Sequence, residues 1–377
     1  MKLRRLAPFL AVACVFMLPL VVVPTACRAA SGYHLLQTIP LAAAPGGKEY
    51  FDYVFFDDAG RRVYVSHGTE VVVIDADSLA VVGTVSGLQS CHGIAVVTEL
   101  GKGFITDSGT QQVVVFDLKT LKTTGAIKTY PDADSIVYDP VSKLVFAFNG
   151  DSKNVAVIDP AAETVVKTVD LGGGPEFAVA DGKGMIYDNN EENSEVVAID
   201  THTLTITSRW PLAPAGGPTA LAMDREHRRL FSAGRKPQIL VMMNADTGAV
   251  IQSFPISAGV DASAFDPETG MLLVSTRAGM LHIFHEDSPD TLSEVETLST
   301  AFGAKTMALD PKTHRVFLST ADFDMPATWP PAAPTAAAAP TAAPAAAPAG
   351  APAGAPAAPQ PRPKAKPGTF HVLVYGM

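Results

Sequence analysis

VVVID at Val71–Asp75 decides the fold, because the chain repeats this stretch at a nearly constant interval. Each copy is an apolar run that ends in an acidic or polar residue. The first six copies follow one another at 41 to 44 residues. A period near 40 indicates one supersecondary unit stacked on copies of itself. The other copies are VVVFD at Val113–Asp117, VAVID at Val155–Asp159, VVAID at Val196–Asp200, LVMMN at Leu240–Asn244, LHIFH at Leu281–His285 and HVLVY at His371–Tyr375.

Each repeat contains four short segments rich in Val, Ile, Phe and Thr, bounded by turn residues, and none is long enough to predict a helix. The third segment is apolar at nearly every position, as expected for a strand covered on both faces. Four-stranded units of this length predict an all-β, seven-bladed β-propeller with antiparallel blades. In the second repeat the four segments are His92–Val97, Gly103–Thr106, Gln112–Asp117 and Lys122–Ile127.

The acidic residue that closes each run has a structural explanation as a turn former. Asp75-Ala76-Asp77-Ser78 and Asp159-Pro160-Ala161-Ala162 join the third strand to the fourth. Asp139-Pro140-Val141-Ser142 joins the first strand to the second in the same way. An Asp at the first turn position accepts hydrogen bonds from nearby backbone N–H groups. These aspartates are therefore expected to shape hairpins.

The ends of the chain are predicted to close the ring. The last blade offers strands at Lys305–Asp310, Arg315–Ser319 and Thr369–Tyr375, and then the chain ends without a fourth. Tyr33–Leu41 (YHLLQTIPL) is similar to the fourth strands of the other blades. Pairing the two ends would remove the open edges that otherwise favour aggregation.

At the second strand of the first blade, VYVSHG at Val63–Gly68 is close to the YVTN tetrapeptide, and Ile74, Asp75 and Ser78 fit the xIDxxT pattern that follows it. The chain thus resembles the bacterial YVTN-repeat, or YncE-like, propellers over residues 33–322 and 368–377. This resemblance implies the propeller fold. The nucleic-acid binding suggested for that family is not expected here.

Three segments follow from composition. Residues 1–29 are predicted to be a signal peptide, with Lys2, Arg4 and Arg5 before the apolar stretch Leu6–Val23 and small residues at the cleavage site. The propeller spans 33–377. Within its last blade, residues 326–367 are almost entirely Ala and Pro, which predicts a disordered or polyproline-like insertion. Its role is open between a neutral expanded loop and a flexible tether.

The N-terminus predicts an exported protein, periplasmic or secreted, and we expect a monomer. Alternatives are a lipoprotein modified at Cys27 and an uncleaved anchor, and membrane contact is expected only in those two cases. After cleavage at Ala29, Cys91 is the remaining cysteine. A disulfide framework is then excluded, and Cys91 is predicted to be a buried small apolar residue.

The charge of the chain is −10, and without the four basic residues of the predicted signal 24 basic residues face 38 acidic ones. Such an acidic protein is repelled by phosphate backbones. Nucleic acid is therefore an unlikely partner, and an envelope protein or a small polar ligand is expected instead.

Counting back five residues from the first turn of each blade gives one residue per blade at the entrance to the first strand. These residues are expected to ring one mouth of the central channel and to form a ligand-binding funnel. They combine carboxylates with an imidazole and an ammonium, more charge than a packed channel needs. A solvated polar rim without a ligand is the alternative. The ring comprises Asp52, His92, Asp134, Glu176, Thr219, Asp261 and Lys305.

The loops between second and third strands are expected on the same face. They add His67, Asp107, Asn149, Asp188, Asn189, Asn190 and Arg235. Oxygen-rich groups of this kind suit Ca²⁺ or Mg²⁺, or hydrogen bonding to a polar ligand. This pattern assigns no particular cofactor, and Ca²⁺ or Mg²⁺ is the candidate cation.

Two functions compete on these observations. The first is a non-catalytic ligand- or protein-binding or scaffold module of the cell envelope, acting through the acidic funnel. The second is a metal-dependent envelope hydrolase similar to lactonase propellers, which implies metal ligands from different blades. Motifs for haem attachment, zinc peptidases, serine hydrolases and phosphate loops do not occur in the sequence. The candidate metal ligands are Asn149, Glu176, Asp188 and Asp261.

Overall fold

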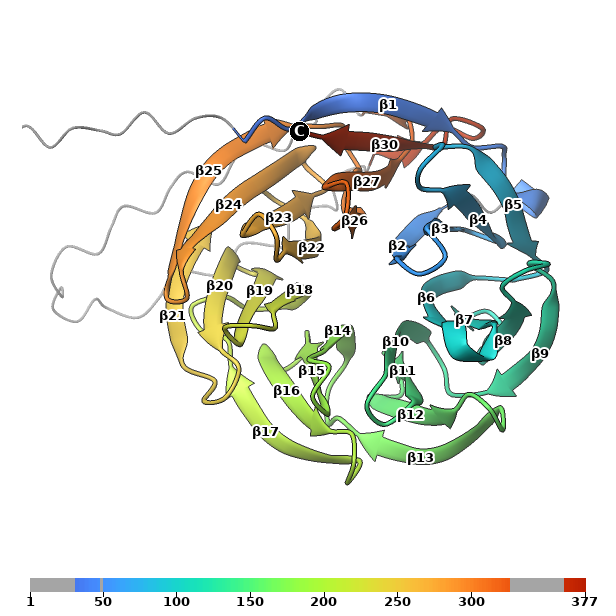
Figure 1. The fold of residues 1–377 in the computed structure, drawn as a ribbon, viewed down its shortest axis with the longest axis horizontal. Helices are drawn as coiled ribbons and strands as arrows, with labels where there is room; N and C mark the ends of the chain where they lie inside the picture. The colour runs from blue at the N-terminus through green and yellow to red at the C-terminus, as the bar shows by residue number, and fades with distance from the viewer. Residues whose placement is uncertain (1–30, 48–49, 326–362) are drawn as a thin grey trace, which may run out of the picture.

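The computed structural model describes residues 31–47, 50–325 and 363–377. Seven four-stranded antiparallel sheets stand around a central axis, as Figure 1 shows, so the predicted seven-bladed β-propeller is confirmed. The described residues contain two short 3-10 segments, Pro45–Gly47 and Thr98–Leu100, and no longer helix. Within these ranges no helix is long and apolar enough to cross a membrane.

In blades one to six the strands pair in chain order. Blades one to three are β2 (Phe51–Asp57), β3 (Arg62–His67), β4 (Glu70–Asp75), β5 (Val81–Ser86); β6 (Cys91–Val97), β7 (Lys102–Asp107), β8 (Gln112–Asp117), β9 (Thr123–Lys128); β10 (Ala133–Asp139), β11 (Leu144–Asn149), β12 (Asn154–Asp159), β13 (Thr164–Asp170). Blades four to six are β14 (Pro175–Ala180), β15 (Met185–Asn190), β16 (Glu195–Asp200), β17 (Thr205–Pro211); β18 (Pro218–Asp224), β19 (Arg229–Arg235), β20 (Gln238–Asn244), β21 (Val250–Pro255); β22 (Val260–Asp266), β23 (Met271–Thr276), β24 (Met280–Ser288), β25 (Thr291–Ser299).

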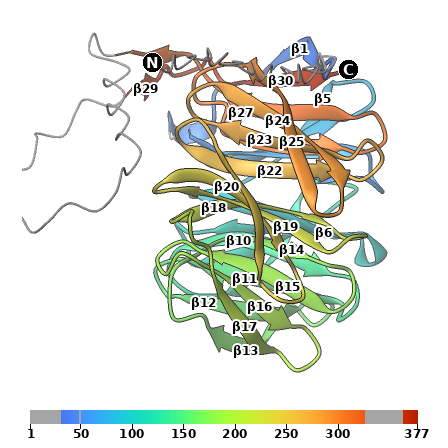
Figure 2. The same cartoon turned by 90° about the vertical axis from the view of Figure 1, so that its left-hand side faces the viewer.

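Blade seven combines both ends of the described chain. Its strand order is β26-β27-β30-β1, and β1 pairs antiparallel with β30 from His34 opposite Gly376 to Pro40 opposite His371. Figures 1 and 2 show β1 and β30 side by side. The strands of this blade are β26 (Thr306–Asp310), β27 (Arg315–Thr320), β30 (His371–Gly376) and β1 (His34–Pro40).

The core lies between neighbouring blades, which explains the repeated sequence. The third strand β4 is buried from Glu70 to Ile74, because sheets cover it on both faces. The outer strand β17 instead alternates between exposed and half-buried residues. One apolar cluster joins blade one to blade seven, with Val54 and Val63 packed among Phe317 and Val372. Each blade is therefore stabilised by its two neighbours.

The aspartates at strand ends form hairpin turns, as predicted. Asp75 Oδ1 accepts a hydrogen bond from the Ser78 backbone N–H at 2.7 Å, and Asp117 Oδ1 accepts one from Thr120 at 2.7 Å. Asp200 does the same for Thr203 at 2.8 Å.

Cys91 is a free, buried cysteine, also as predicted.

Two predicted segments lie wholly or mostly outside the described residues. The signal peptide, residues 1–29, is one of them. Of the insertion at 326–367, residues 326–362 are outside the described ranges. The prediction of disorder is wrong for its last residues, because β29 (Lys364–Ala365) pairs with β28 (Phe323–Asp324) beside blade seven. The backbone N–H of Lys366 also donates to the Asp322 carbonyl at 2.8 Å, which closes this base of the loop.

Candidate functional site: a charged funnel

The seven predicted ring residues meet at one mouth of the central channel. A cavity of about 170 Å³ opens there, and Arg235 and the first-strand residues Tyr53 and Phe177 also line it. His92 lies just outside the cavity and contacts two of its acidic side chains. Because each first strand enters the sheet at this end, one side chain per blade reaches the axis. The ring residues that line the cavity are Asp52, Asp134, Glu176, Thr219, Asp261 and Lys305.

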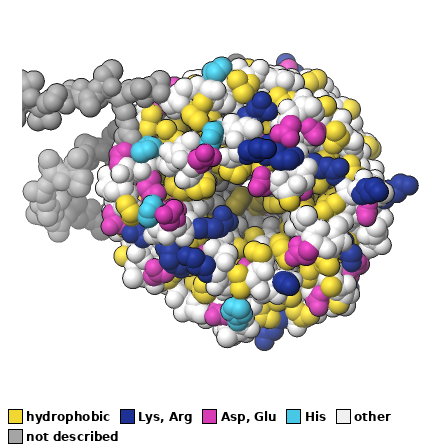
Figure 3. All heavy atoms as spheres, in the orientation of Figure 1, with side chains coloured by type: hydrophobic (Ala, Val, Ile, Leu, Met, Phe, Trp, Pro, Cys, Tyr) yellow, Lys and Arg dark blue, Asp and Glu magenta, His cyan; other side chains and the backbone are white. Residues whose placement is uncertain are grey.

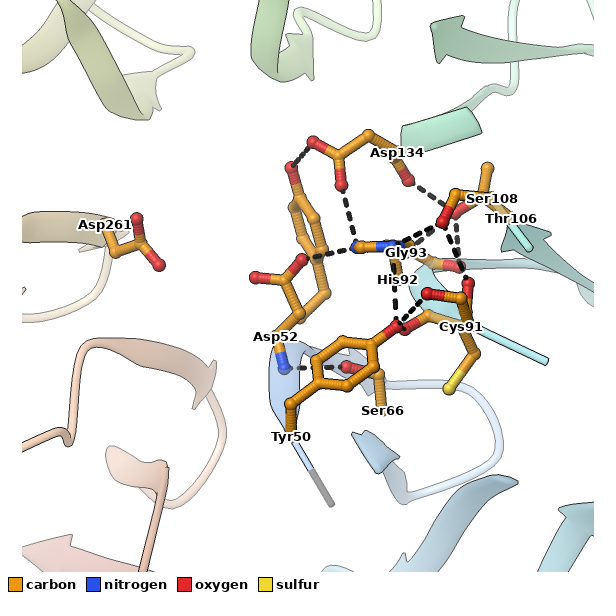
Figure 4. Close-up of polar contacts among 12 residues, drawn as sticks. Tyr50, Asp52, Ser66, Cys91, His92, Gly93, Thr106, Ser108, Asp134 and Asp261 are labelled. Carbon is orange, nitrogen blue, oxygen red and sulfur yellow. Dashed lines mark hydrogen bonds and ion pairs between the residues drawn. The ribbon is translucent and has the colours of Figure 1, made fainter. Parts of the chain in front are cut away.

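His92 joins the acidic residues of blades one and three. Its Nδ1 lies 2.7 Å from Asp52 Oδ2 and 3.2 Å from Asp134 Oδ1, as Figure 4 shows. Its Nε2 lies 2.9 Å from Ser108 Oγ. Asp52, His92 and Asp134 place ligand atoms within 4.8 Å of one another, so this group could hold a metal ion.

The three side chains shift one another's pKa values. Burial favours neutral His92, but its contacts with Asp134 and Asp52 outweigh burial and raise the pKa of His92 to about 10. Burial likewise opposes ionisation of Asp52, yet the His92 hydrogen bond and the Lys305 charge hold the pKa of Asp52 below its ordinary value. For Asp134, burial and then the Asp52 charge raise the pKa despite His92. A charged imidazole thus bridges the two carboxyl groups.

Asp261 receives the other two cations of the funnel. Lys305 Nζ and Arg235 both contact its carboxylate. Lys305 also lies 3.6 Å from Asp52. In Figure 4 Asp261 is set apart from the His92 group, on the opposite side of the mouth. Arg235 was expected on this face as a loop residue, and the structure adds it to the funnel itself.

Glu176 is the acidic group with the weakest neutralisation. Its nearest basic atom is Arg235 Nη1 at 3.8 Å, and Arg235 makes its close contact with Asp261. Burial and then the Asp134 charge raise the pKa of Glu176 to about 8, although Arg235 lowers it. Near neutral pH an added positive charge would therefore stabilise the ionised form of this carboxyl group.

Tyr53 and Phe177 form an aromatic floor that the sequence analysis did not identify. Their rings stack with centroids 5.6 Å apart. The Tyr53 hydroxyl donates to the Glu176 carbonyl at 2.7 Å and to Asp134 Oδ2 at 3.3 Å. Both residues directly follow a ring residue in the sequence. An aromatic residue at that position could have predicted the aromatic floor. The same pair also lines an apolar cavity of about 440 Å³ further along the channel. Figure 3 shows apolar side chains in the central hollow, with charged ones around it.

Thr219 contributes less than predicted. It lines the cavity, but it is buried and its hydroxyl donates to the Val260 carbonyl at 2.8 Å. The side chain therefore fixes blade five against blade six.

Most of the predicted loop residues are interior. Asp107 accepts hydrogen bonds from the backbone N–H groups of Gln89 and Ser90 at 3.0 and 2.8 Å. Asn189 is bonded to Ser232 and to the Ala220 carbonyl. The second strands end at His67, Asp107, Asn149 and Asn190, whereas Asp188 and Asn189 lie within β15. The buried loop residues are His67, Asp107, Asn149, Asp188, Asn189 and Asn190.

The predicted metal set does not converge. Asn149 is buried and bonded to Asn154 within its own blade, and burial raises the pKa of Asp188 well above its ordinary value. Arg235 separates Glu176 from Asp261. Over the described ranges, His, Cys, Asp and Glu make two groups with suitable spacing, and neither contains Glu176, Asp188 or Asp261. The structure therefore does not bring these four candidate ligands together.

A second hollow of about 520 Å³ adjoins the funnel on the side of blades three to five. Asp134 and Glu176 line both spaces. Glu191 and Lys236 lie further out in the hollow. Its acidic side chains extend the negative charge of the funnel outward, and they are Asp132, Asp134, Glu176, Glu191 and Glu192.

Fold and site together define a seven-bladed propeller with a charged funnel, and comparison with known proteins adds little to that. Residues 58–214 match a family described as a domain of unknown function, DUF5074. No curated protein matches the chain in sequence. Hydrazine synthase of Kuenenia stuttgartiensis is similar in structure, with a TM-score of 0.63 and 14% identity, over 77% of this chain and 95% of that one. At this identity the likeness shows the propeller fold alone.

Proposed function

We propose that this chain is an exported, YncE-like binding propeller of the cell envelope that holds an organic ammonium group in its funnel without catalysing a reaction. The group belongs to a small polar ligand or to a lysine side chain of an envelope partner. The propeller works as a monomer in the periplasm or outside the cell.

The charge balance of the funnel carries this proposal. Four carboxyl groups, Asp52, Asp134, Glu176 and Asp261, face three cationic side chains. His92, Lys305 and Arg235 make their closest ion pairs with Asp52 and Asp261. One further positive charge beside Glu176 and Asp134 would balance the site. Such a charge would stabilise the ionised form of Glu176.

The aromatic floor supports an organic cation in particular. Tyr53 and Phe177 lie directly beside this acidic edge, and ring faces attract an ammonium group. The cavity is small, so it admits a head group, while the adjoining acidic hollow offers room for the rest of the ligand.

Calorimetric titration with trilysine at pH 8 tests the proposal, with triglutamate as the opposite-charge control. Trilysine should bind and triglutamate should not. Glu176→Gln, which keeps the shape and removes the charge, should weaken trilysine binding at least tenfold. Glu163→Gln makes the same change at an outer ion pair with Lys102 and should leave the affinity unchanged. Equal affinities in both variants would contradict the assignment.

The group Asp52, His92 and Asp134 supports a second candidate, a metal-dependent hydrolase with a divalent cation in the funnel. This reading predicts metal-dependent turnover of a lactone or phosphoester that Asp134→Asn abolishes. Trilysine binding without any such turnover would favour the non-catalytic role.

The pH dependence of stability offers an independent check on Glu176. Its pKa is about 8 in the folded protein against an ordinary 4.5, so the folded state holds a proton that the unfolded chain releases. Stability is therefore lost as the pH rises from about 4.5 to about 8. Glu176→Gln removes this loss, and its Tm relative to wild type should rise between pH 5 and pH 8. A Tm difference that does not change with pH would show that Glu176 ionises normally.

A further inference from the structure

At the end of the ring opposite the funnel, neighbouring blades are joined by a repeated ion pair. The Asp at the end of one first strand meets a basic side chain from the first turn of the next blade. Asp310 of blade seven lies 2.5 Å from Arg61 of blade one, and Asp181 of blade four lies 3.0 Å from Arg228 of blade five. His314 of blade seven lies 2.6 Å from Asp266 of blade six.

Among the described residues, three of the seven junctions carry this pair, and the junction between blades five and six does not. The basic partners Arg61, Arg228 and His314 occupy one turn position with φ between 52° and 58°. In blade six this position is Gly270, at φ 68°, so Asp224 of blade five receives no cation from it.

A buried carboxylate, that of Glu286, also lies at the junction between blades five and six. The backbone N–H of Glu286 donates to the Gly270 carbonyl at 2.9 Å, just as Ala76 donates to Arg61 and Ala245 to Arg228, both at 3.0 Å. Glu286 therefore occupies a repeat position that holds alanine in those blades. Its side chain is 4% exposed, and its Oε1 atom is buried with no hydrogen-bond partner.

The third unusual feature of this junction is a histidine side chain in the first turn of blade five. Three residues after the turn Asp, blades three, six and seven carry a hydroxyl that donates to that Asp at 2.7 or 2.8 Å, from Ser142, Thr269 and Thr313. Blade five carries His227, whose Nδ1 lies 2.7 Å from Asp224 Oδ2 and 3.5 Å from Glu286 Oε2. Ligand atoms of Asp224, His227 and Glu286 all lie within 4.8 Å of one another.

We propose that Asp224, His227 and Glu286 form a site for a divalent transition-metal ion that joins blades five and six. The ion takes the place of the basic side chain that Gly270 does not supply. One imidazole nitrogen and two carboxylates suit Zn²⁺ or a similar ion better than Ca²⁺, which takes oxygen ligands. A protonated His227 offers one positive charge to two carboxylates, whereas a divalent ion offers two.

The other glycine junctions provide an internal comparison. Gly101 and Gly184 occupy the corresponding turns of blades two and four. Across the ranges that the structure describes, neither junction gains a grouping of this kind, since the one other group is the funnel's own. Loss of the basic residue alone thus does not produce the cluster.

Titration with Zn²⁺ alone, followed by calorimetry and by Tm, tests the site. Wild type should bind Zn²⁺ at this cluster and gain Tm. Glu286→Gln should weaken this binding at least tenfold. Gly270→Arg should also abolish it, because the arginine restores the ion pair with Asp224. Arginines occupy the same backbone position in blades one and five, and an added Cβ at Gly270 comes no closer than 3.5 Å to another residue.

Two controls separate this site from others. Asp134→Asn alters the funnel group and should leave the Zn²⁺ binding at blades five and six intact. His285→Ala removes the neighbouring half-exposed imidazole, which contacts Asp287 and not the cluster. If His285→Ala reduces binding as much as Glu286→Gln, or if Glu286→Gln and Gly270→Arg both bind as wild type does, the proposal is wrong. Absence of Zn²⁺ binding in wild type would also overturn it.

Discussion

Ile39→Asp is expected to lower the free energy of unfolding by about 4 kcal/mol or more, a large share of the roughly 5–15 kcal/mol that stabilises a typical domain. Ile39 lies on β1 with 4% of its surface exposed. It belongs to the cluster that joins blade one to blade seven. A carboxylate there has no partner, and it opens the seam at which the ring closes.

Urea unfolding of Ile39→Asp and of Thr38→Asp measures this effect. Thr38 is the exposed neighbour on the same strand, so the same substitution there should change stability by less than about 0.5 kcal/mol. If Ile39→Asp gives no soluble protein, Ile39→Ala should still cost about 2–4 kcal/mol. Equal, small costs at both positions would mean that β1 does not hold the last blade.

The second large effect is expected for His92→Ala, at about 3 kcal/mol near pH 7. The substitution leaves Asp52 and Asp134 facing each other with only 21% and 18% of their side chains exposed. The lost imidazolium had placed one positive charge between them.

The pH dependence identifies the cause of that loss. The pKa of His92 is about 10 in the folded protein against an ordinary 6.5. Its contribution is therefore complete below pH 6.5 and disappears as the pH rises toward 10. Urea midpoints of wild type and His92→Ala should differ most near pH 6 and converge toward pH 10. A difference that stays constant across this range would assign the loss to packing alone.

The fold could be predicted because the information is local and repeated seven times. The apolar third strands require cover on both faces, and the turn aspartates fix where each hairpin lies. Counting along the repeat also located the funnel residues, since a fixed distance from a turn defines one end of a strand. Asp52, Asp134, Glu176 and Asp261 meet there for this reason.

Counting along the repeat could not predict how deeply each side chain is buried or which side chains contact one another. Asn149 is the last residue of β11 and Asp188 lies two residues before the end of β15, but both side chains are fully buried, so they cannot serve as funnel ligands. The position of a residue along a strand predicts how far it lies from either end of the central channel. It does not predict how deeply neighbouring residues bury its side chain. Arg235 reaches Asp261 because its side chain is long, and this too depends on packing. Glu286 stands out in sequence only when aligned with Ala76 and Ala245, and its contact with Asp224 needs the folded ring.

A crystal structure of the protein grown with trilysine at pH 8 tests the central proposal most directly. We expect a lysine ammonium within hydrogen-bond distance of the Glu176 carboxylate and close to Asp134, over the rings of Tyr53 and Phe177. The ion pairs of Asp261 with Lys305 and Arg235 should remain in place. A funnel filled only by water, with trilysine bound elsewhere on the surface, would contradict the assignment of this mouth as the binding site.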